Sequence, residues 1–368
     1  MASSNTCFKA DNETDLTATF LKNPPKKLLL TLSQNCNLAC KHCFRQLKPG
    51  LKGEMSTELL DKLLTEVFPH LEYVRVGGAD LGEPMTYSFF DYMMQKARGS
   101  GPFIELQSNG VLIDEGNVDS IVSCCDRVCL SAEGSGESYE RVRGVSYGRF
   151  REAVRLLVEA RGRINPGMRI EFVVAALMYS YPSLDALFRV PGVDAVNLRY
   201  LEPVYASDYA NSPFSRMDES DKWIDYYTAL AEELDVFFSH PGKFGEGNPN
   251  ERIQCPLPWE SVHVDFDGTV YSCCEDLYMG RLGLNDELTS VWNNKAYQRL
   301  RETVNSQKPP IACRNCYATT HPKKRAENIK KKLYYTSILR QTDKLAYRLG
   351  GWGLSSKLKR MYSSYLSR

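Results

Sequence analysis

Three of the twelve cysteines lie within eight residues, in the run Cys36-Asn-Leu-Ala-Cys40-Lys-His-Cys43. Three thiolates on one short loop can hold three irons of a cubane [4Fe–4S] cluster. The fourth iron then has no protein ligand, and an open coordination position is what a catalytic metal site needs. The alternative is a zinc loop in which His42 or a distant cysteine supplies the fourth ligand.

A second cysteine set lies late in the chain. It consists of Cys255, Cys273, Cys313 and Cys316, and Cys274 directly follows one of its members. Four thiolates can fully ligate one [4Fe–4S] cluster, but they can equally form a closed zinc site. A third group, Cys124, Cys125 and Cys129, has no fourth ligand nearby, so we interpret it as buried packing.

Composition indicates an ordinary globular protein in a reducing compartment. Hydrophobic residues make up 43% of the 368 residues and charged residues 25%. No apolar stretch is long enough to span a bilayer, and the first twenty residues do not resemble a secretory signal. We therefore expect a cytoplasmic protein, in which clustered cysteines bind metal rather than form disulfides.

Strand-like and helix-like patterns alternate between residues 26 and 201. The expected strands are Leu28–Leu32, Tyr73–Val76, Phe103–Leu106, Val128–Leu130, Ile170–Leu177 and Ala195–Leu201. Six β–α repeats with short strands predict a parallel sheet, either open or wrapped into a barrel. Active sites of both architectures lie at the carboxyl ends of the strands.

Short motifs follow four of these strands in order. The first cysteine loop follows the first strand, and Gly82-Glu83-Pro84 follows the second. Gln107-Ser108-Asn109-Gly110 ends the third strand. The run from Leu130 to Gly134 ends the fourth, and Tyr139-Glu-Arg-Val-Arg143-Gly144 comes soon after it.

Together, these motifs resemble those of the radical S-adenosylmethionine superfamily. The resemblance implies a partial (β/α)6 TIM-type barrel in which Cys36, Cys40 and Cys43 bind a [4Fe–4S] cluster. It further implies that S-adenosylmethionine chelates the open iron and is reductively cleaved to a 5′-deoxyadenosyl radical. A one-electron donor of flavodoxin or ferredoxin type is then an expected partner.

The resemblance also implies contacts to the cofactor. His42 occupies the position of an aromatic residue near the adenine. Gly82, Glu83 and Pro84 match the element that binds the amino group, although three residues separate Gly78 from Gly82, so Gly77 and Gly78 are interpreted as turn residues. The remaining expected cofactor-binding residues are Ser108, Asn109, Ser131, Glu133 and Arg143. Glu133 stands where the family has Asp at the ribose, and Arg143 would pair with the cofactor carboxylate or a substrate anion.

The late cysteines resemble the twitch form of the SPASM-type auxiliary domain. Cys255, Cys273, Cys313 and Cys316 are then the ligands of one auxiliary [4Fe–4S] cluster, since no cysteine follows Cys316. Cys274 is interpreted either as a packing residue or as the catalytic donor of a hydrogen atom.

The fold class expected is therefore α/β, with five segments. These are an extension (1–25), the barrel (26–201), a connection (202–254), the auxiliary domain (255–320) and a basic helical tail (321–368). The tail carries thirteen Lys and Arg against two acids, a net charge of +11. Such a tail suits an anionic membrane surface, or it packs on the barrel. The acidic remainder argues against nucleic-acid binding.

The substrate expected first is a small molecule of sugar or glycoconjugate type, with dehydrogenation or epimerisation as the outcome. An auxiliary cluster suits oxidation, because it can accept the second electron from a substrate radical. The alternative is a peptide-modifying enzyme. An alternative of another class is a zinc-bound, non-catalytic protein that binds anions.

Overall fold

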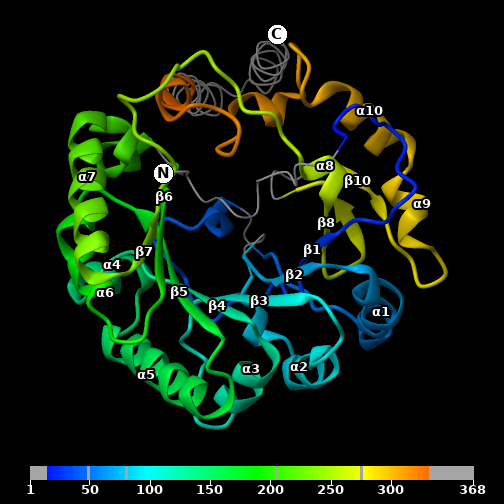
Figure 1. Ribbon diagram of the computed structural model, residues 1–368, viewed down its shortest axis with the longest axis horizontal. Helices are drawn as coiled ribbons and strands as arrows, with labels where there is room; N and C mark the ends of the chain where they lie inside the picture. The colour runs from blue at the N-terminus through cyan, green and yellow to red at the C-terminus, as the bar shows by residue number, and fades with distance from the viewer. Residues whose placement is uncertain (1–14, 48–49, 79–81, 204–205, 274–276, 331–368) are drawn as a thin grey trace, which may run out of the picture.

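The computed structural model describes residues 15–47, 50–78, 82–203, 206–273 and 277–330. Within these ranges ten strands form one sheet in the order β10-β9-β8-β1-β2-β3-β4-β5-β6-β7. Adjacent strands from β8 through β1 to β7 pair in parallel, whereas β8, β9 and β10 form an antiparallel meander. The sheet curves into an incomplete ring with helices on its outside (Figure 1).

The six strands expected from the apolar runs form as β1 to β6, and four further strands join the same sheet. Their bounds are β1 Lys27–Leu30, β2 Tyr73–Val76, β3 Phe103–Ser108, β4 Arg127–Ser131, β5 Arg169–Ala176, β6 Ala195–Tyr200, β7 Phe237–Ser239, β8 Ser261–Val264, β9 Thr269–Tyr271 and β10 Tyr278–Arg281. Alternate residues such as Val74 and Val76 are fully buried and belong to the core shared with the outer helices. Because neighbouring side chains of a strand point to opposite faces, the residues between them face the inside of the ring.

The helices cover the outer face of this sheet (Figure 1). They are α1 Thr57–Lys62, α2 Phe90–Ala97, α3 Val118–Cys124, α4 Glu137–Arg143, α5 Tyr147–Ile164, α6 Asp185–Phe188, α7 Met217–Leu234, α8 Leu257–Glu260, α9 Leu288–Trp292 and α10 Lys295–Thr303. A π-helical turn, Leu63–Val67, continues α1. Within the described ranges, every helix is too short or too polar to cross a lipid bilayer.

The segment 202–254, expected as a connection, holds regular structure of its own. It contains α7 and β7, and β7 pairs in parallel with β6 through Asn197 and Ser239. A seventh β–α unit therefore extends the barrel. β7 has three residues, which is too short for a strand pattern to be recognised in the sequence. Its pairing with β6 identifies it as a strand.

The stretch from Leu288 to Thr303 forms two helices, α9 and α10, rather than one. The break falls at two asparagines whose side chains compete for backbone groups. Asn294 caps α10 by accepting a hydrogen bond from the Tyr297 N–H at 3.0 Å. The Asn293 side chain exchanges two hydrogen bonds, of 2.9 and 2.8 Å, with the backbone of Leu21.

The auxiliary domain is joined to the barrel by strand pairing. β8 lies beside β1 in register, with Lys27 opposite Ser261 and Leu30 opposite Val264. The hairpin turn between β8 and β9 lies at Gly268, where φ is +83° and a Cβ would lie 2.4 Å from the Leu282 carbonyl oxygen. The N-terminal segment runs along α9 and α10 (Figure 1), where the Arg301 guanidinium donates to the Thr19 carbonyl at 2.9 Å.

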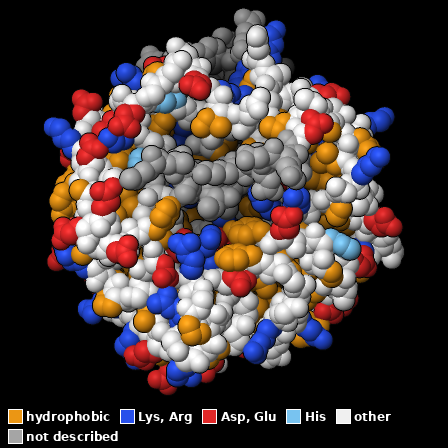
Figure 2. Space-filling model, in the orientation of Figure 1, with side chains coloured by type: hydrophobic (Ala, Val, Ile, Leu, Met, Phe, Trp, Pro, Cys, Tyr) orange, Lys and Arg blue, Asp and Glu red, His pale blue; other side chains and the backbone are white. Residues whose placement is uncertain are grey.

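The beginning of the basic tail packs on the barrel. Arg325 is 4% exposed, pairs with Glu202 at 2.5 Å and lies over the ring of Phe214. The remainder of the tail, and with it the predicted membrane contact, lies outside the described residues. Acidic and basic side chains are interspersed around the rim of the face seen in Figure 2.

Candidate functional site

The first cysteine loop follows β1 and lies at the carboxyl ends of the barrel strands. Its cysteines are partly buried thiols. Cys43 Sγ accepts a hydrogen bond from the Arg45 N–H at 3.4 Å, and Cys40 Sγ accepts one from the Arg143 guanidinium at 3.6 Å. Burial raises the pKa of Cys36 and of Cys40, whereas hydrogen bonds to their sulfurs act in the opposite direction and favour the thiolates. The donor set therefore fits an iron–sulfur cluster.

Gly82 locks the loop after β2 against the cysteine loop. A Cβ on Gly82 would lie 1.9 Å from the carbonyl oxygen of Ser33, so no larger residue fits there without a backbone shift. The next residue, Glu83, donates its backbone N–H to the Asn35 carbonyl at 2.7 Å. The Thr86 hydroxyl contacts the same carbonyl at 3.1 Å. The two motifs expected to share the cofactor are therefore in direct contact.

The Glu83 carboxylate connects the end of β2 with the end of β3. It is 3% exposed and accepts hydrogen bonds from the Ser108 hydroxyl at 2.7 Å and the Asn109 N–H at 2.8 Å. Burial raises the pKa of Glu83, and these hydrogen bonds act in the opposite direction. Pro84, the residue after Glu83, is also buried. A carboxylate has about four acceptor positions, so Glu83 retains capacity for an ammonium group.

Asn109 joins this network to the cysteine loop from the other side. Its side-chain amide donates to the Asn37 side chain at 2.8 Å, within the run between Cys36 and Cys40. Ser131 ends β4, in register with Val173 of β5. The expected polar residues of the first four strands thus lie at one end of the sheet.

Glu133 and Arg143 form a buried ion pair beside Cys40. The guanidinium binds both carboxylate oxygens, through Nε at 2.5 Å and Nη2 at 2.6 Å, and its third nitrogen is the donor to Cys40 Sγ. Both side chains are about one-tenth exposed. Burial acts to lower the pKa of Arg143, but Glu133 outweighs it and raises this pKa, so the arginine stays charged. The sequence did not predict this pairing.

His42, within the cysteine loop, is buried against the two loops that follow β5 and β6. Its Nε2 lies 3.4 Å from the Tyr179 hydroxyl and its Nδ1 lies 3.7 Å from the Asp208 carboxylate. Burial lowers the pKa of His42, although Asp208 acts to raise it. Tyr179 and Asp208 were not predicted as neighbours, because they follow β5 and β6, where the sequence shows no motif.

Three of the late cysteines, Cys255, Cys313 and Cys316, lie near one another. Burial raises the pKa of Cys255 to about 12, and the neighbouring Cys316 and Cys313 thiols add to this effect. Cys255 is fixed by Asn305, which accepts from its N–H at 2.8 Å and donates to its carbonyl at 3.1 Å. Cys273 follows β9, and the Ala318 N–H donates to Cys316 Sγ at 3.4 Å. Cys274 lies outside the described residues.

No three Cys, His, Asp or Glu side chains of the described ranges are arranged to hold a single metal ion. The assignment of these cysteines as cluster ligands is therefore a prediction from the motifs and from the donor chemistry. The group Cys124, Cys125 and Cys129 is buried in and beside the core, as expected of packing residues.

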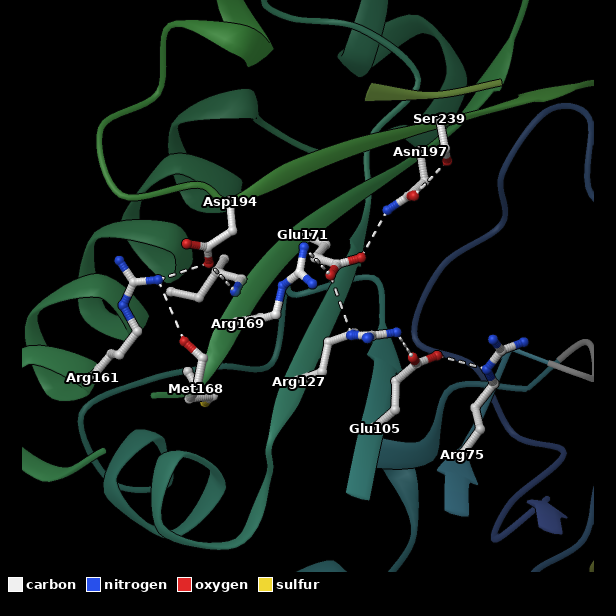
Figure 3. Close-up of polar contacts among 11 residues, drawn as sticks. Arg75, Glu105, Arg127, Arg161, Met168, Arg169, Glu171, Asp194, Asn197 and Ser239 are labelled. Carbon is white, nitrogen blue, oxygen red and sulfur yellow. Dashed lines mark hydrogen bonds and ion pairs between the residues drawn. The ribbon is translucent and has the colours of Figure 1, made fainter. Parts of the chain in front are cut away.

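A ladder of charged and polar side chains crosses the inside of the barrel (Figure 3). Glu105 lies between Arg75 at 2.6 Å and Arg127 at 2.9 Å, and Arg127 reaches Glu171 at 3.2 Å. The ladder continues through Asn197 to Ser239, with hydrogen bonds of 2.9 and 2.6 Å. This ladder was not predicted from the sequence. A charged residue at an inward-facing position of successive buried strands would have indicated it.

Comparison with known proteins identifies the family. The profile of the radical SAM superfamily matches residues 30–170, and that of the SPASM iron–sulfur cluster-binding domain matches residues 255–317. The chain belongs to the radical SAM superfamily and carries a C-terminal SPASM domain. S-adenosylmethionine, a [4Fe–4S] cluster and auxiliary iron–sulfur ligation follow from this membership, as predicted.

Two curated relatives bear on the function. The mycofactocin maturase MftC of Mycobacterium ulcerans is 32% identical over 317 residues, which cover 79% of this chain and 80% of that protein. The tungsten-containing aldehyde ferredoxin oxidoreductase cofactor-modifying protein of Pyrococcus furiosus is 28% identical over 195 residues. That match covers 50% of this chain and 54% of the relative, about half its length.

Solved structures share the fold at low identity. Streptococcus suis SuiB bound to S-adenosylmethionine has a TM-score of 0.60 at 16% identity, covering 77% of this chain and 70% of that chain. The protein anSMEcpe, with bound S-adenosylmethionine and the Cp18Cys peptide, has a TM-score of 0.60 at 17% identity, covering 88% and 100%. These likenesses confirm the predicted α/β barrel with its SPASM-type domain.

Proposed function

We propose that this protein is a radical S-adenosylmethionine maturase that modifies a peptide. The observation that carries the proposal is the 32% identity to a maturase over most of both chains. The sequence alone placed a sugar-like substrate first and a peptide second. The relatives support the second reading better, and SuiB, which shares the fold, has been solved with a precursor peptide.

Each cofactor has a proposed set of residues. Cys36, Cys40 and Cys43 would hold the catalytic [4Fe–4S] cluster, because they are thiols on one loop with N–H donors directed at their sulfurs. The four late cysteines would hold an auxiliary cluster. When bound, the catalytic cluster and S-adenosylmethionine supply a 5′-deoxyadenosyl radical that abstracts hydrogen.

The chain's own residues position the cofactor. Glu83 would accept the ammonium group with its remaining lone pairs, while Ser108 and Asn109 fix its carboxylate. His42 would contact the adenine from its buried position. Of the other predicted contacts, Arg143 retains guanidinium protons for the cofactor carboxylate, because its bonds to Glu133 and Cys40 use three of its five.

The interior ladder lies on the inner face of the barrel strands. Its members from Arg75 to Asn197 lie at the starts or middles of β2 to β6 and Ser239 ends β7, whereas Ser108 and Ser131 end β3 and β4. A polar interior can satisfy the amide groups of a peptide, which would be costly to bury against apolar walls. The ladder therefore suits an extended peptide segment entering from the carboxyl ends of the strands.

The test is anaerobic turnover with defined substrates. Reconstituted enzyme, S-adenosylmethionine and a one-electron reductant are incubated with synthetic peptides translated from short reading frames beside the gene. A parallel set contains hydroxylated sugars. We expect 5′-deoxyadenosine together with a mass change in a peptide. Turnover of a sugar with all peptides unchanged would refute the proposal.

A pair of cysteine variants controls for loss of fold. Cys40→Ala should lose about four irons and form no 5′-deoxyadenosine. Cys124→Ala removes a more deeply buried thiol at the end of α3, so it should retain the iron and the activity. If Cys40→Ala retains full iron content, the proposed ligand set is wrong.

A further inference from the structure

The buried Glu133–Arg143 pair contacts a proposed cluster ligand directly. Arg143 is the last residue of α4, and Gly144 ends that helix in the left-handed region at φ +73°. One turn of the same helix anchors the cysteine loop, because the Lys41 N–H donates to the Val142 carbonyl at 2.9 Å. The position of the guanidinium relative to Cys40 is therefore fixed by backbone contacts.

Both partners of the pair are strongly constrained. Glu133 uses both oxygens on Arg143, at 2.5 and 2.6 Å, and the planar guanidinium matches this two-point contact. The charge on Arg143 is largely shielded from solvent, since its side chain is 11% exposed. Electrostatic interactions over a few ångströms are much stronger in such surroundings than in water.

A cation that donates a hydrogen bond to a cluster sulfur favours the reduced cluster, which carries one more negative charge. Hydrogen bonds to sulfur and net charge nearby are known determinants of iron–sulfur reduction potentials. Glu133 acts in the opposite sense, because its negative charge lies on the far side of the same guanidinium. The two residues therefore have opposite effects on the ease of reduction.

We propose that Arg143 and Glu133 are positioning residues that set the reduction potential of the catalytic cluster through Cys40. The step concerned is the transfer of one electron from an external low-potential iron–sulfur or flavin carrier to the oxidised cluster. Arg143 makes this transfer more favourable, and Glu133 limits the effect and orients the guanidinium. The inference rests on the proposed function, since it takes Cys40 as a cluster ligand.

The experiment is a redox titration of the reconstituted enzyme followed by electron paramagnetic resonance. The catalytic cluster is identified as the signal that changes when S-adenosylmethionine is added. Arg143→Gln should lower the ratio of reduced to oxidised cluster at a fixed potential at least tenfold, or about 59 mV for one electron. Glu133→Gln should shift the potential in the opposite direction.

Two exposed residues of α4 provide matched charge changes. Arg141→Gln and Glu137→Gln remove a positive and a negative charge from the exposed side of α4, where water screens them. Each should change the ratio less than threefold. Arg143→Lys and Glu133→Asp retain the charges, so they should return the potential toward wild type even if the glutamine variants bind less iron.

The possible results distinguish a failure of this inference from a failure of the proposed function. Shifts of the same sign in Arg143→Gln and Glu133→Gln, or shifts no larger than those of the exposed controls, would overturn the inference and leave the proposed function standing. A wild-type protein without any cluster signal that responds to S-adenosylmethionine would instead overturn the proposed function.

Discussion

Replacing Glu105 by Gln tests the interior ladder. Glu105 is 1% exposed, and its two oxygens bind Arg75 and Arg127 from the neighbouring strands. Glutamine preserves the shape but removes the negative charge, which leaves two guanidinium groups facing each other inside the barrel. The strand register holds them in place, because Arg75, Glu105 and Arg127 are direct partners in β2, β3 and β4.

The size of the effect follows from burial. Removing one partner of a buried ion pair costs about 3–5 kcal/mol. The arginine side chains are 20% and 15% exposed, so water partly stabilises them once the carboxylate is gone. We therefore expect the lower end, about 3 kcal/mol of unfolding free energy.

The assay is anaerobic denaturant unfolding followed by the fluorescence of the four tryptophans. The matched control is Glu152→Gln, which breaks the exposed pair to Arg155 on the surface of α5 and should leave the unfolding free energy nearly unchanged. Adding Arg75→Met to Glu105→Gln should destabilise less than the sum of the two single changes. A Glu105→Gln effect equal to that of the control would refute the reasoning.

The ion pairs of Glu105 with Arg75 and Arg127 also predict that the stability depends on pH. Burial acts to raise the pKa of Glu105, but Arg75 and Arg127 outweigh it and hold the pKa below its usual value. The stabilisation is therefore present above the pKa of the unfolded chain and is lost as the pH falls through the folded pKa. Wild type and Glu105→Gln should differ most near neutral pH and converge in acid.

Three further predictions concern the cofactor end of the barrel. Gly82→Ala should cost about 1–3 kcal/mol of stability and weaken S-adenosylmethionine binding, because its Cβ meets the Ser33 carbonyl. The control is Gly162→Ala in α5, where the added Cβ meets no neighbouring residue within 4 Å. This control should instead stabilise the protein, as thermal unfolding would show. Calorimetry should find that S-adenosylmethionine affinity rises with pH through the raised pKa of Glu83, and Glu83→Gln should remove that rise and cost about tenfold or more in affinity. Cys313→Ala should lose the auxiliary cluster yet still form 5′-deoxyadenosine; complete substrate turnover by this variant would rule out a redox role for that cluster.

The sequence predicts the strands well because buried parallel strands consist of apolar runs, as in Ile170–Leu177 against the observed β5. It also predicts which motifs share an end of the sheet, since each follows a strand. It does not predict which side chains of that end bind each other. The resemblance places Glu133 at the ribose of the cofactor, but only the position of α4 shows that Arg143 binds both of its oxygens.

The sequence also does not predict contacts between distant parts of the chain. Nothing local to β7 marks it as a strand, since only β6 beside it completes its hydrogen bonds. The break at Asn293 likewise depends on Leu21, far away in the chain. In both cases a tertiary partner overrides the local pattern, which propensity cannot show.

The pairing of β1 with β8 also sets the order of events during synthesis. Lys27 leaves the ribosome long before its partner Ser261, and at about 5–20 residues per second the interval is about 10–50 s. For that time one edge of β1 lacks its final neighbour, with its backbone groups open to pairing with other chains. Nascent protein is therefore most vulnerable to aggregation before residue 264 has emerged, and slower translation of residues 202–260 would lengthen that exposure.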